Sequence, residues 1–362
     1  MRDLVDEFKP DIIHCNDWHT GLMGVFLKED FWHDDFYKGI KVIYTIHNLK
    51  YQGIYPPSIM RDIIGLPQEL FDNGNLECDG CVNYMKSGMV YADHITTVSP
   101  SYAQEITYPY FGEGLDGYIR DNGEKVTGII NGLDIDVYNP ETDPYIKRQY
   151  SVANARAGKR ENKDALRAEL GLRIKRGVPM IAMVTRLVED KGLDLVTRIM
   201  DELVDDDVQL VLVVTGDAGY EEAFRELARR HPTKVSANIT FNEALAHKVY
   251  AAADMFLMPS RYEPCGLSQL IALRYGAIPI VYGEDPLKTH IQPFDKYRKE
   301  GNGLVFYHFT ARDCRYTIQR AQSYYEDATL WQRLVHNAMT SDYSWDRSAE
   351  AYQNLYEKVL QQ

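Results

Sequence analysis

The sequence lacks a long apolar run. No stretch of about 18 apolar residues occurs in its 362 residues, which excludes a transmembrane helix. Its first seven residues are mostly charged or polar and do not resemble a signal peptide. Cysteine is scarce, at five residues, and an odd number without a signal peptide indicates reduced thiols. These absences together predict a cytoplasmic protein.

The sequence has fewer basic than acidic residues. Forty Lys and Arg against 53 Asp and Glu give a formal net charge of -13, which argues against a nucleic acid or an anionic membrane as partner. An acidic protein that binds an anion therefore needs a local cluster of cations. Metal-binding patterns are also missing, since Cys78-Asp79-Gly80-Cys81 is a single CxxC pair, more typical of a loop than of a metal site. We predict neither a metal nor a cofactor.

Short apolar runs alternate with helical patterns along the chain. The runs that we expect to form strands are residues 11–15, 41–46, 94–99 and 126–130, then 179–184, 209–214, 235–241, 255–259, 277–281 and 303–306. Most of them end in polar loops that lead into helices, which is typical of doubly wound parallel sheets. The sequence predicts an α/β protein with two Rossmann-like domains and a cleft between them. Only four strands fall in the first domain, which predicts that this domain is incomplete.

The domain boundaries follow from a loss of periodicity after residue 136. We expect an N-terminal domain over 1–145 and a linker over 146–160, where the chain carries irregular, glycine-containing sequence. The second domain is expected over 161–340. Residues 341–362 are expected to form a helix that returns toward the first domain.

The stretch Ser260 to Leu270 links an apolar run to a helical pattern. Such a turn delivers Glu263 and a glycine to a helix N-terminus, where free backbone N–H groups suit an anion or a ligand rich in hydroxyl groups. A plain connection between strand and helix is the other interpretation.

Other polar side chains are expected at the same kind of strand end. Arg186 and Lys191 follow the first strand of the second domain and suit a diphosphate, although a solvated charged loop would look the same. Asp17 and His47 follow neighbouring strands of the first domain, although a single histidine such as His47 is more often structural than catalytic. Trp18 offers a face on which a sugar could stack or a side chain for the core. Asn131 suits either a tight turn or a hydrogen bond in the cleft.

Several of these segments carry a family resemblance. The chain resembles the bacterial and plant glycogen and starch synthases, retaining glucosyltransferases of the GT-B architecture. The similar segments are His14 to His19, Thr45 to Gly53, Tyr91 to Pro100, Ile130 to Asp134, Thr185 to Leu187 with Lys191 to Asp194, and Ser260 to Leu267. They cover essentially the whole chain.

The resemblance implies a reaction and a role for each residue. ADP-glucose, or UDP-glucose in some members, would donate glucose to the end of an α-1,4-glucan such as glycogen. Arg186 and Lys191 would hold the diphosphate and stabilise the leaving group without a metal. Glu263, with the amides of Cys265 and Gly266, would bind glucose hydroxyls in a turn that includes Leu267.

The remaining roles implied by the resemblance concern the first domain and the base. His47 would lie over the sugar, and Asp17 and Asn131 would line the cleft on the acceptor side. Phe241, where the family usually has Tyr, would stack on the adenine.

The chain departs from the family in two places. The family's N-terminal Lys-x-Gly-Gly-Leu loop has no counterpart here, which implies that part of the first domain is absent. The family's Thr-Gly-Gly-Leu segment is replaced around Glu284-Asp285-Pro286, where proline offers no N–H and two carboxylates repel a diphosphate. These departures leave a second hypothesis, a catalytically impaired homologue that binds glucan or regulates. A third is a nucleotide-sugar transferase with another acceptor.

Overall fold

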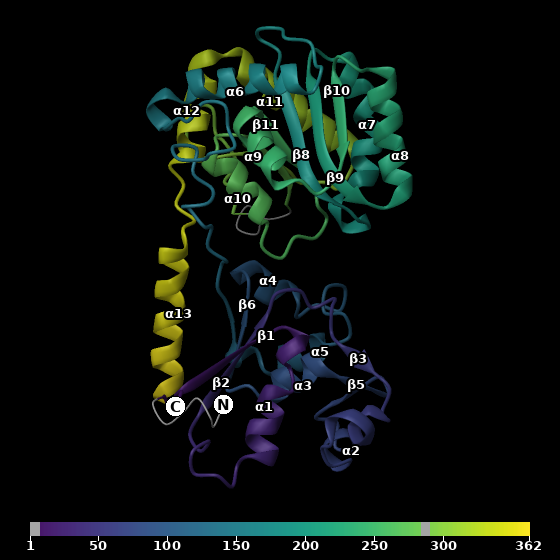
Figure 1. The fold of residues 1–362 in the computed structure, drawn as a ribbon, viewed down its shortest axis with the longest axis vertical. Helices are drawn as coiled ribbons and strands as arrows, with labels where there is room; N and C mark the ends of the chain where they lie inside the picture. The colour runs from purple at the N-terminus through teal and green to yellow at the C-terminus, as the bar shows by residue number, and fades with distance from the viewer. Residues whose placement is uncertain (1–7, 284–289) are drawn as a thin grey trace. The chain divides into compact units, whose positions relative to one another are not determined.

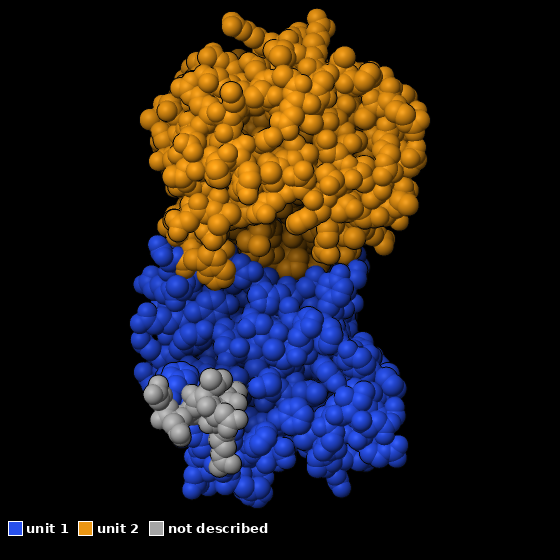
Figure 2. Space-filling model, in the orientation of Figure 1, with its two compact units in different colours: residues 1–131, 346–362 blue, residues 132–345 orange. Residues whose placement is uncertain are grey.

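The computed structural model of the chain describes residues 8–283 and 290–362. Contacts divide the chain into two compact units, unit 1 with residues 1–131 and 346–362 and unit 2 with residues 132–345 (Figure 2). The boundary therefore lies earlier than the expected position at 145, and the expected linker at 146–160 belongs to unit 2. The reason is that Tyr150 is buried there and donates a hydrogen bond to the carbonyl oxygen of Tyr275 at 2.7 Å.

Unit 1 contains a four-stranded parallel sheet in the order β1-β2-β6-β7 (Figure 1). Its strands are β1 (Ile12–Asn16), β2 (Lys41–Ile46), β6 (His94–Thr97) and β7 (Val126–Gly128). The C-terminal helix α13 (Trp345–Leu360) packs on this sheet, with Leu355 and Val359 in one apolar cluster with Ile43 and Ile129. From residue 346 onward the C-terminal segment is therefore part of unit 1.

The helices of unit 1 other than α13 are short. They are α1 (Met23–Val25), continued by a π-helix (Phe26–Asp30), a second π-helix (Met60–Ile64), α2 (Glu69–Asp72), α3 (Tyr84–Tyr91), α4 (Pro100–Glu105) and α5 (Asp116–Asp121), with 3₁₀ turns at Trp18–Thr20 and Gly123–Lys125.

A small antiparallel sheet of unit 1 was not predicted from the sequence. It has the order β3-β5-β4, with β3 (Ile54–Tyr55), β4 (Glu77–Cys78) and β5 (Cys81–Asn83). The CxxC pair flanks the turn between β4 and β5, and Asp79 and Gly80 both have positive φ, at 50° and 75°. This geometry is typical of a two-residue hairpin turn, so the motif is a local turn signal.

Unit 2 contains a six-stranded parallel sheet in the order β10-β9-β8-β11-β12-β13. The strands are β8 (Met180–Leu187), β9 (Gln209–Gly216), β10 (Val235–Ile239), β11 (Met255–Met258), β12 (Ile278–Tyr282) and β13 (Leu304–Phe306). The first three strands run outward in one direction and the last three in the other, so the order reverses between β8 and β11. In open α/β sheets, ligands bind beside the carboxyl ends of the strands at such a reversal.

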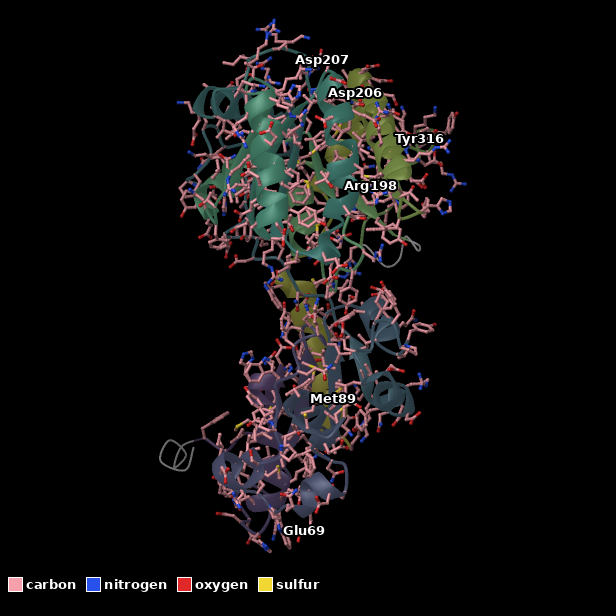
Figure 3. All side chains as sticks on the ribbon, turned by 90° about the vertical axis from the view of Figure 1, so that its right-hand side faces the viewer. Glu69, Met89, Arg198, Asp206, Asp207 and Tyr316 are labelled. Carbon is pink, nitrogen blue, oxygen red and sulfur yellow. The ribbon has the colours of Figure 1, made fainter. Side chains whose placement is uncertain are left out.

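Helices cover the sheet of unit 2. They are α6 (Ala155–Glu169), α7 (Leu193–Asp205), α8 (Ala218–Arg230), α9 (Glu243–Ala252), α10 (Leu267–Arg274), α11 (Ala311–Glu326) and α12 (Ala328–Met339), with 3₁₀ turns at Val152–Asn154 and Glu189–Lys191. Helices α7 and α11, which carry Arg198 and Tyr316, lie side by side in Figure 3. An ion pair between Arg315 and Glu202 joins them. Among the described residues, no helix is both long and apolar enough to span a bilayer.

A buried ion pair anchors α6 to the sheet of unit 2. Lys163 Nζ lies 2.6 Å from Asp254 Oδ2, and the two side chains are only 8% and 7% exposed. The same carboxylate oxygen accepts the N–H of Met180 at 2.7 Å. Asp254 directly precedes β11, so the pair ties the start of β8, the start of β11 and α6 together.

We predict that Asp254→Ala lowers the free energy of unfolding of unit 2 by about 3–5 kcal/mol, because it leaves the Lys163 ammonium buried without its partner. Asp207→Ala is the matched control, since Asp207 pairs with Lys175 at 2.6 Å but both side chains are largely exposed. It should cost less than about 1 kcal/mol. Urea unfolding followed by circular dichroism measures both, and equal losses would contradict this account of the buried pair.

Candidate functional site

Two connections lie together at the reversal of the unit 2 sheet. One follows β8 and contains Lys191 and Gly192, and the other follows β11 and contains Glu263. The backbone N–H of Arg261 donates to the carbonyl oxygen of Asp190 at 2.9 Å, which joins them directly. The carboxyl ends of β8 and β11 therefore share one continuous loop surface, as the order of the sheet requires.

Gly192 fits closely between the two connections. It has φ 66°, and a Cβ atom added there would lie 2.1 Å from the carbonyl oxygen of Pro259. It also occupies the position before α7, where a left-handed backbone turns the chain into the helix. Only glycine meets both demands, since other residues rarely adopt this φ and have a Cβ.

Lys191 and Glu263 form an ion pair across this contact. Lys191 Nζ lies 2.5 Å from Glu263 Oε2, and both side chains are largely buried. An ammonium group has three N–H donors and a carboxylate has two oxygens, so each partner keeps capacity to bind another group. The structure thus brings together two residues to which the sequence assigned separate ligands, a phosphate and a sugar.

The turn after β11 leads into α10 at Gly266, which has φ 75° and precedes the first helical residue. The first N–H groups of a helix have no partner within the helix, and they attract negative or oxygen-rich ligands. Leu267, the first residue of α10, is exposed, and Cys265 is partly exposed. The turn therefore leads from strand to helix through a glycine, as expected, and its role in binding a sugar stays a prediction.

Arg186 and Phe241 also lie at carboxyl ends of unit 2 strands. Arg186 is on β8 itself, opposite Thr215 of β9, so it is a strand residue and not the loop residue expected from the sequence. Its side chain is exposed. Phe241 follows β10, which ends at Ile239 rather than at 241 as expected, and it is 92% exposed. A phenylalanine so exposed is costly to leave in water and suits stacking on a flat ligand.

In unit 1, Asp17 and His47 meet at the ends of the neighbouring strands β1 and β2. The backbone N–H of His47 donates to Asp17 Oδ1 at 2.8 Å. Asp17 has φ 54°, which is rare for a residue with a Cβ, and its own N–H donates to the carbonyl oxygen of Thr45 at 2.9 Å. A strained backbone held by such bonds is common at functional sites.

Asn16 orients the imidazole of His47. Asn16 Oδ1 lies 2.9 Å from His47 Nε2, and Asn16 Nδ2 donates to the carbonyl oxygen of His14 at 3.5 Å. With Nε2 as the donor to this amide oxygen, Nδ1 of the neutral ring is left as an acceptor. His47 can then accept a hydrogen bond from a hydroxyl group.

His14, on β1, makes hydrogen-bond contacts next to the same strand ends. Its Nε2 lies 2.6 Å from Thr45 Oγ1, and its Nδ1 lies 2.8 Å from the hydroxyl of Tyr356 on α13. Burial, with a smaller contribution from the charge of His47, lowers the pKa of His14. The neutral ring thus links the C-terminal helix to β2, the strand that ends just before His47.

Trp18 and Asn131 differ in how the structure places them. The indole of Trp18 stacks on His19 with ring centroids 4.0 Å apart, and a Cβ at Gly53 would lie 2.5 Å from its ring. These contacts favour packing over a free stacking face. Asn131 is partly exposed and is the last residue of unit 1 before the boundary. Its role in a cleft stays a prediction, as does the convergence of residues from the two units.

Two further expectations concern metals and the loop after β12. Within residues 8–283 and 290–362, no group of three or more His, Cys, Asp and Glu side chains is placed to hold a metal ion. The replacement at Glu284-Asp285-Pro286 lies outside the described residues.

The sequence interpretation missed Asn16, His14 and Gly192. Asn16 was part of a quoted motif, but its contact with His47 depends on the pairing of β1 with β2. Gly192 follows a lysine in a polar loop, and the demand for glycine arises from Pro259, 67 residues later in the chain. Contacts between strand ends that are distant in sequence give no local signal.

Comparison with known proteins supports this description. The sequence profile of the starch synthase catalytic domain matches residues 1–121, and that of glycosyl transferases group 1 matches residues 165–321. Glycogen synthases from Desulforamulus reducens and Bacillus cereus strain Q1 are each 48% identical over 98% of this chain and 74% of their own length.

Solved structures give a matching result. The catalytic domain of starch synthase IV from Arabidopsis thaliana, bound to ADP and acarbose, superimposes with a TM-score of 0.91 and 33% identity over 99% of this chain and 75% of that one. A sucrose-phosphate synthase from Thermosynechococcus elongatus has a TM-score of 0.62 at 19% identity, over 99% and 76% of the two chains, and shares the fold.

Two parallel α/β units with loops at the carboxyl ends of their strands make this protein a glycosyltransferase of the GT-B architecture. More narrowly, the chain belongs to the glycogen and starch synthase family of glucosyltransferases. The fold class and family predicted from the sequence are thereby confirmed.

We predict that Gly192→Ala destabilises the protein by at least about 2 kcal/mol, because the new Cβ combines an unfavourable φ with a clash against Pro259. Gly171→Ala is the control, since Gly171 has φ 69° but nothing within 4 Å of the added Cβ. It should cost only about 1 kcal/mol. Thermal unfolding measures the stability of both variants. A loss of stability in Gly192→Ala no larger than that in Gly171→Ala would contradict the close contact with Pro259.

We also predict that stability falls as the pH drops below 6.5, the usual pKa of histidine. The folded state keeps His14 neutral while the unfolded chain takes up a proton, so protonation favours unfolding, by at most about 1.4 kcal/mol per pH unit for one group. His14→Gln should flatten this dependence between pH 7 and 5.5. His33→Gln, at an exposed histidine, should leave it unchanged. An unaltered slope in His14→Gln would show that His14 does not contribute.

Proposed function

We propose that the protein transfers glucose from ADP-glucose to the non-reducing end of an α-1,4-glucan. The observation that carries the proposal is the Lys191–Glu263 ion pair at the reversal of the unit 2 sheet. It lies where open α/β sheets bind nucleotides, at the same end of the sheet as the exposed Arg186 on β8 and the N-terminus of α10. The solved starch synthase neighbour was bound to ADP and acarbose.

Each residue of unit 2 has a role in this proposal. Lys191 uses one N–H to hold Glu263 and directs the others, with Arg186, at the diphosphate. As the glycosidic bond breaks, negative charge grows on the leaving phosphate, and these fixed cations stabilise it. Glu263 keeps one oxygen for a glucose hydroxyl, with backbone amides of the turn at Cys265 and Gly266 as further donors. Phe241 stacks on the adenine.

The residues of unit 1 hold the sugar and the acceptor. His47, oriented by Asn16, accepts a hydrogen bond from a glucose hydroxyl at Nδ1. Asp17 fixes the backbone of His47, and Asn131 contacts the acceptor glucan. The acceptor hydroxyl attacks on the face from which the diphosphate leaves and passes its proton to a phosphate oxygen, which retains the configuration. No metal is required, and a cytoplasmic location remains our expectation.

Transfer of labelled glucose from ADP-glucose to glycogen tests the reaction. We expect incorporation by the unmodified chain, and a loss of about 10²–10³ in kcat for Lys191→Gln, which removes a cation from the developing charge. Lys175→Gln, at an exposed ion pair, should retain activity. Glycogen binding without transfer from either ADP-glucose or UDP-glucose would favour the catalytically impaired homologue instead, and transfer to another acceptor would favour the third hypothesis.

Binding of ADP tests the role of Phe241 separately from turnover. Stacking of a base on an aromatic side chain contributes about 1–3 kcal/mol, so Phe241→Ala should weaken ADP binding by about 5- to 140-fold. Phe241→Tyr, which keeps the ring, should bind ADP about as well as the unmodified chain. Calorimetry measures both, and equal affinity in Phe241→Ala would remove this residue from the site.

A further inference from the structure

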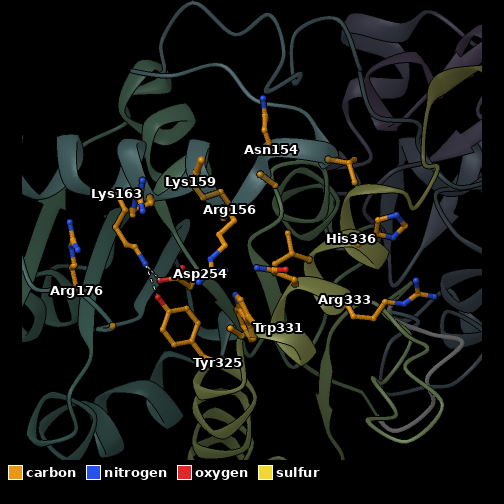
Figure 4. Close-up of a pocket in the computed structure, with 18 of the residues that line it drawn as sticks. Asn154, Arg156, Lys159, Lys163, Arg176, Asp254, Tyr325, Trp331, Arg333 and His336 are labelled. Carbon is orange, nitrogen blue, oxygen red and sulfur yellow. Dashed lines mark hydrogen bonds and ion pairs between the residues drawn. The ribbon is translucent and has the colours of Figure 1, made fainter.

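Unit 2 contains a strongly basic pocket. It lies between α6 and α12, with a volume of about 1090 Å³ (Figure 4). Its cations come mostly from α6 and α12, with Arg176 from the segment before β8. The pocket is large enough for a small organic ligand, since such sites commonly measure 300–1,000 Å³.

The pocket is separate from the candidate functional site. Asp254, in its wall, directly precedes β11, whereas Glu263 comes after the end of that strand. Lys159, also in the wall, donates to the carbonyl oxygens of Ala251 and Tyr275, at the C-terminal ends of α9 and α10. In a parallel sheet these features mark the edge at the amino ends of the strands. The pocket is therefore at the opposite edge of the sheet.

The basic residues of α6 share one face of the helix. Arg156, Lys159, Arg160, Lys163 and Arg167 occupy positions i, i+3, i+4, i+7 and i+11, the pattern of one face of a helix. In Figure 4, the side chains of Arg156 and Lys163 extend from α6 toward the side where Asp254 and Tyr325 lie. Five cations against the single carboxylate of Asp164 on the α6 residues that line the cavity create a local positive potential in an otherwise acidic protein.

The buried cations of this face already have partners. Lys163 pairs with Asp254, and Arg167 donates to Gln209, Asp164 and the carbonyl oxygen of Val178. The two carboxylates in the lining, Asp164 and Asp254, are thus each neutralised by one of these cations. They do not offset the charge of the remaining arginines.

Three exposed arginines of the lining have no such partner. Among the described residues, the side chains of Arg156, Arg160 and Arg176 make no ion pair with a carboxylate. Arg225 and Arg229, two other exposed arginines of unit 2, pair with glutamates. Among the described residues, Arg173 and Arg312 also make no ion pair, but they lie singly outside the pocket, so the clustering is what distinguishes the three arginines of the lining. Arg156 and Arg160 also lie in the first turns of α6, where the helix dipole favours anions rather than cations, so their clustering there costs energy.

We propose that this pocket binds a small organic phosphate monoester. Arg156, Arg160 and Arg176 hold the phosphate, since guanidinium groups match phosphate oxygens with paired N–H donors. The dipole of α6 adds to the attraction for a dianion. Trp331 and Tyr325, whose rings lie 5.2 Å apart, supply an apolar wall for the organic part. A sugar phosphate and a nucleoside monophosphate share this chemistry.

Calorimetric titration of the full chain at low salt tests the proposal. The probes are glucose 6-phosphate, adenosine monophosphate and inorganic phosphate, with glucose and adenosine as neutral counterparts. We expect saturable binding of one of the two organic phosphates, at least about tenfold tighter than inorganic phosphate, and none of its neutral counterpart. If glucose 6-phosphate binds more tightly, the organic part of the ligand is a sugar. If adenosine monophosphate binds more tightly, it is a nucleoside.

Variants then locate the binding. Arg156→Gln with Arg160→Gln should weaken binding of the preferred probe by at least about tenfold, since two charge-assisted hydrogen bonds are lost. Arg173→Gln with Arg312→Gln removes the same charge from exposed positions outside the pocket and should change affinity by less than about twofold. Because all four positions are exposed, these variants are expected to fold.

Arg186→Gln with Lys191→Gln distinguishes this pocket from the site at the carboxyl ends of the strands, and should leave binding of the probe unchanged. No saturable binding of either organic phosphate would overturn the proposal. An equal loss in the Arg173 and Arg312 control, or loss of binding only in the Arg186 and Lys191 variant, would overturn it as well. Inorganic phosphate binding as tightly as the organic probes would overturn the assignment of an organic ligand.

Discussion

The ion pair between Lys191 and Glu263 is the interaction on which the functional side of unit 2 depends. It joins the connection after β8 to the connection after β11, at the one point where the order of the sheet reverses. Gly192 and the bond from Arg261 to Asp190 hold the two backbones close enough for the side chains to meet. In the proposed reaction, the pair links the groups that hold phosphate to those that hold sugar. The same ion pair therefore positions both the lysine that stabilises the leaving phosphate and the glutamate that binds the glucose.

The same principle, a polar group that joins neighbouring strand ends, operates in unit 1. Asp17 connects the end of β1 to His47 at the end of β2, and Asn16 sets the orientation of the imidazole. Behind them, His14 reaches Tyr356 of the C-terminal helix. Helix α13 thus supports a candidate site whose residues Asn16, Asp17 and His47 lie within the first 50 positions of the chain.

Much of this arrangement could be predicted from the sequence, because its signals are local. Apolar runs ending in polar loops indicated the parallel sheets, and Lys41–Ile46 is the strand expected. The motifs around His47 and Glu263 indicated the family. What the sequence could not provide were contacts between segments far apart, such as Lys191 with Glu263. The boundary between units was misplaced because an irregular segment can pack on a domain as well as connect two, as Tyr150 shows.

The basic face of α6 was missed for a different reason. The spacing of Arg156, Arg160 and Arg167 was visible in the sequence, but the expected linker ran to residue 160, so Arg156 and Arg160 lay in the supposed linker. A helix with buried lysines runs against the usual apolar pattern, and the partners of Lys159 and Lys163 are a helix end and a carboxylate of distant segments.

A double-mutant cycle on Lys191 and Glu263 tests the central claim most directly. The affinity for ADP-glucose would be measured by calorimetry in the unmodified chain, Lys191→Gln, Glu263→Gln and the double variant. If the pair acts as one unit, the loss in the double variant is smaller than the sum of the single losses by at least about 1 kcal/mol. Losses that add within about 0.3 kcal/mol would show that the two side chains bind the donor independently and would contradict the account.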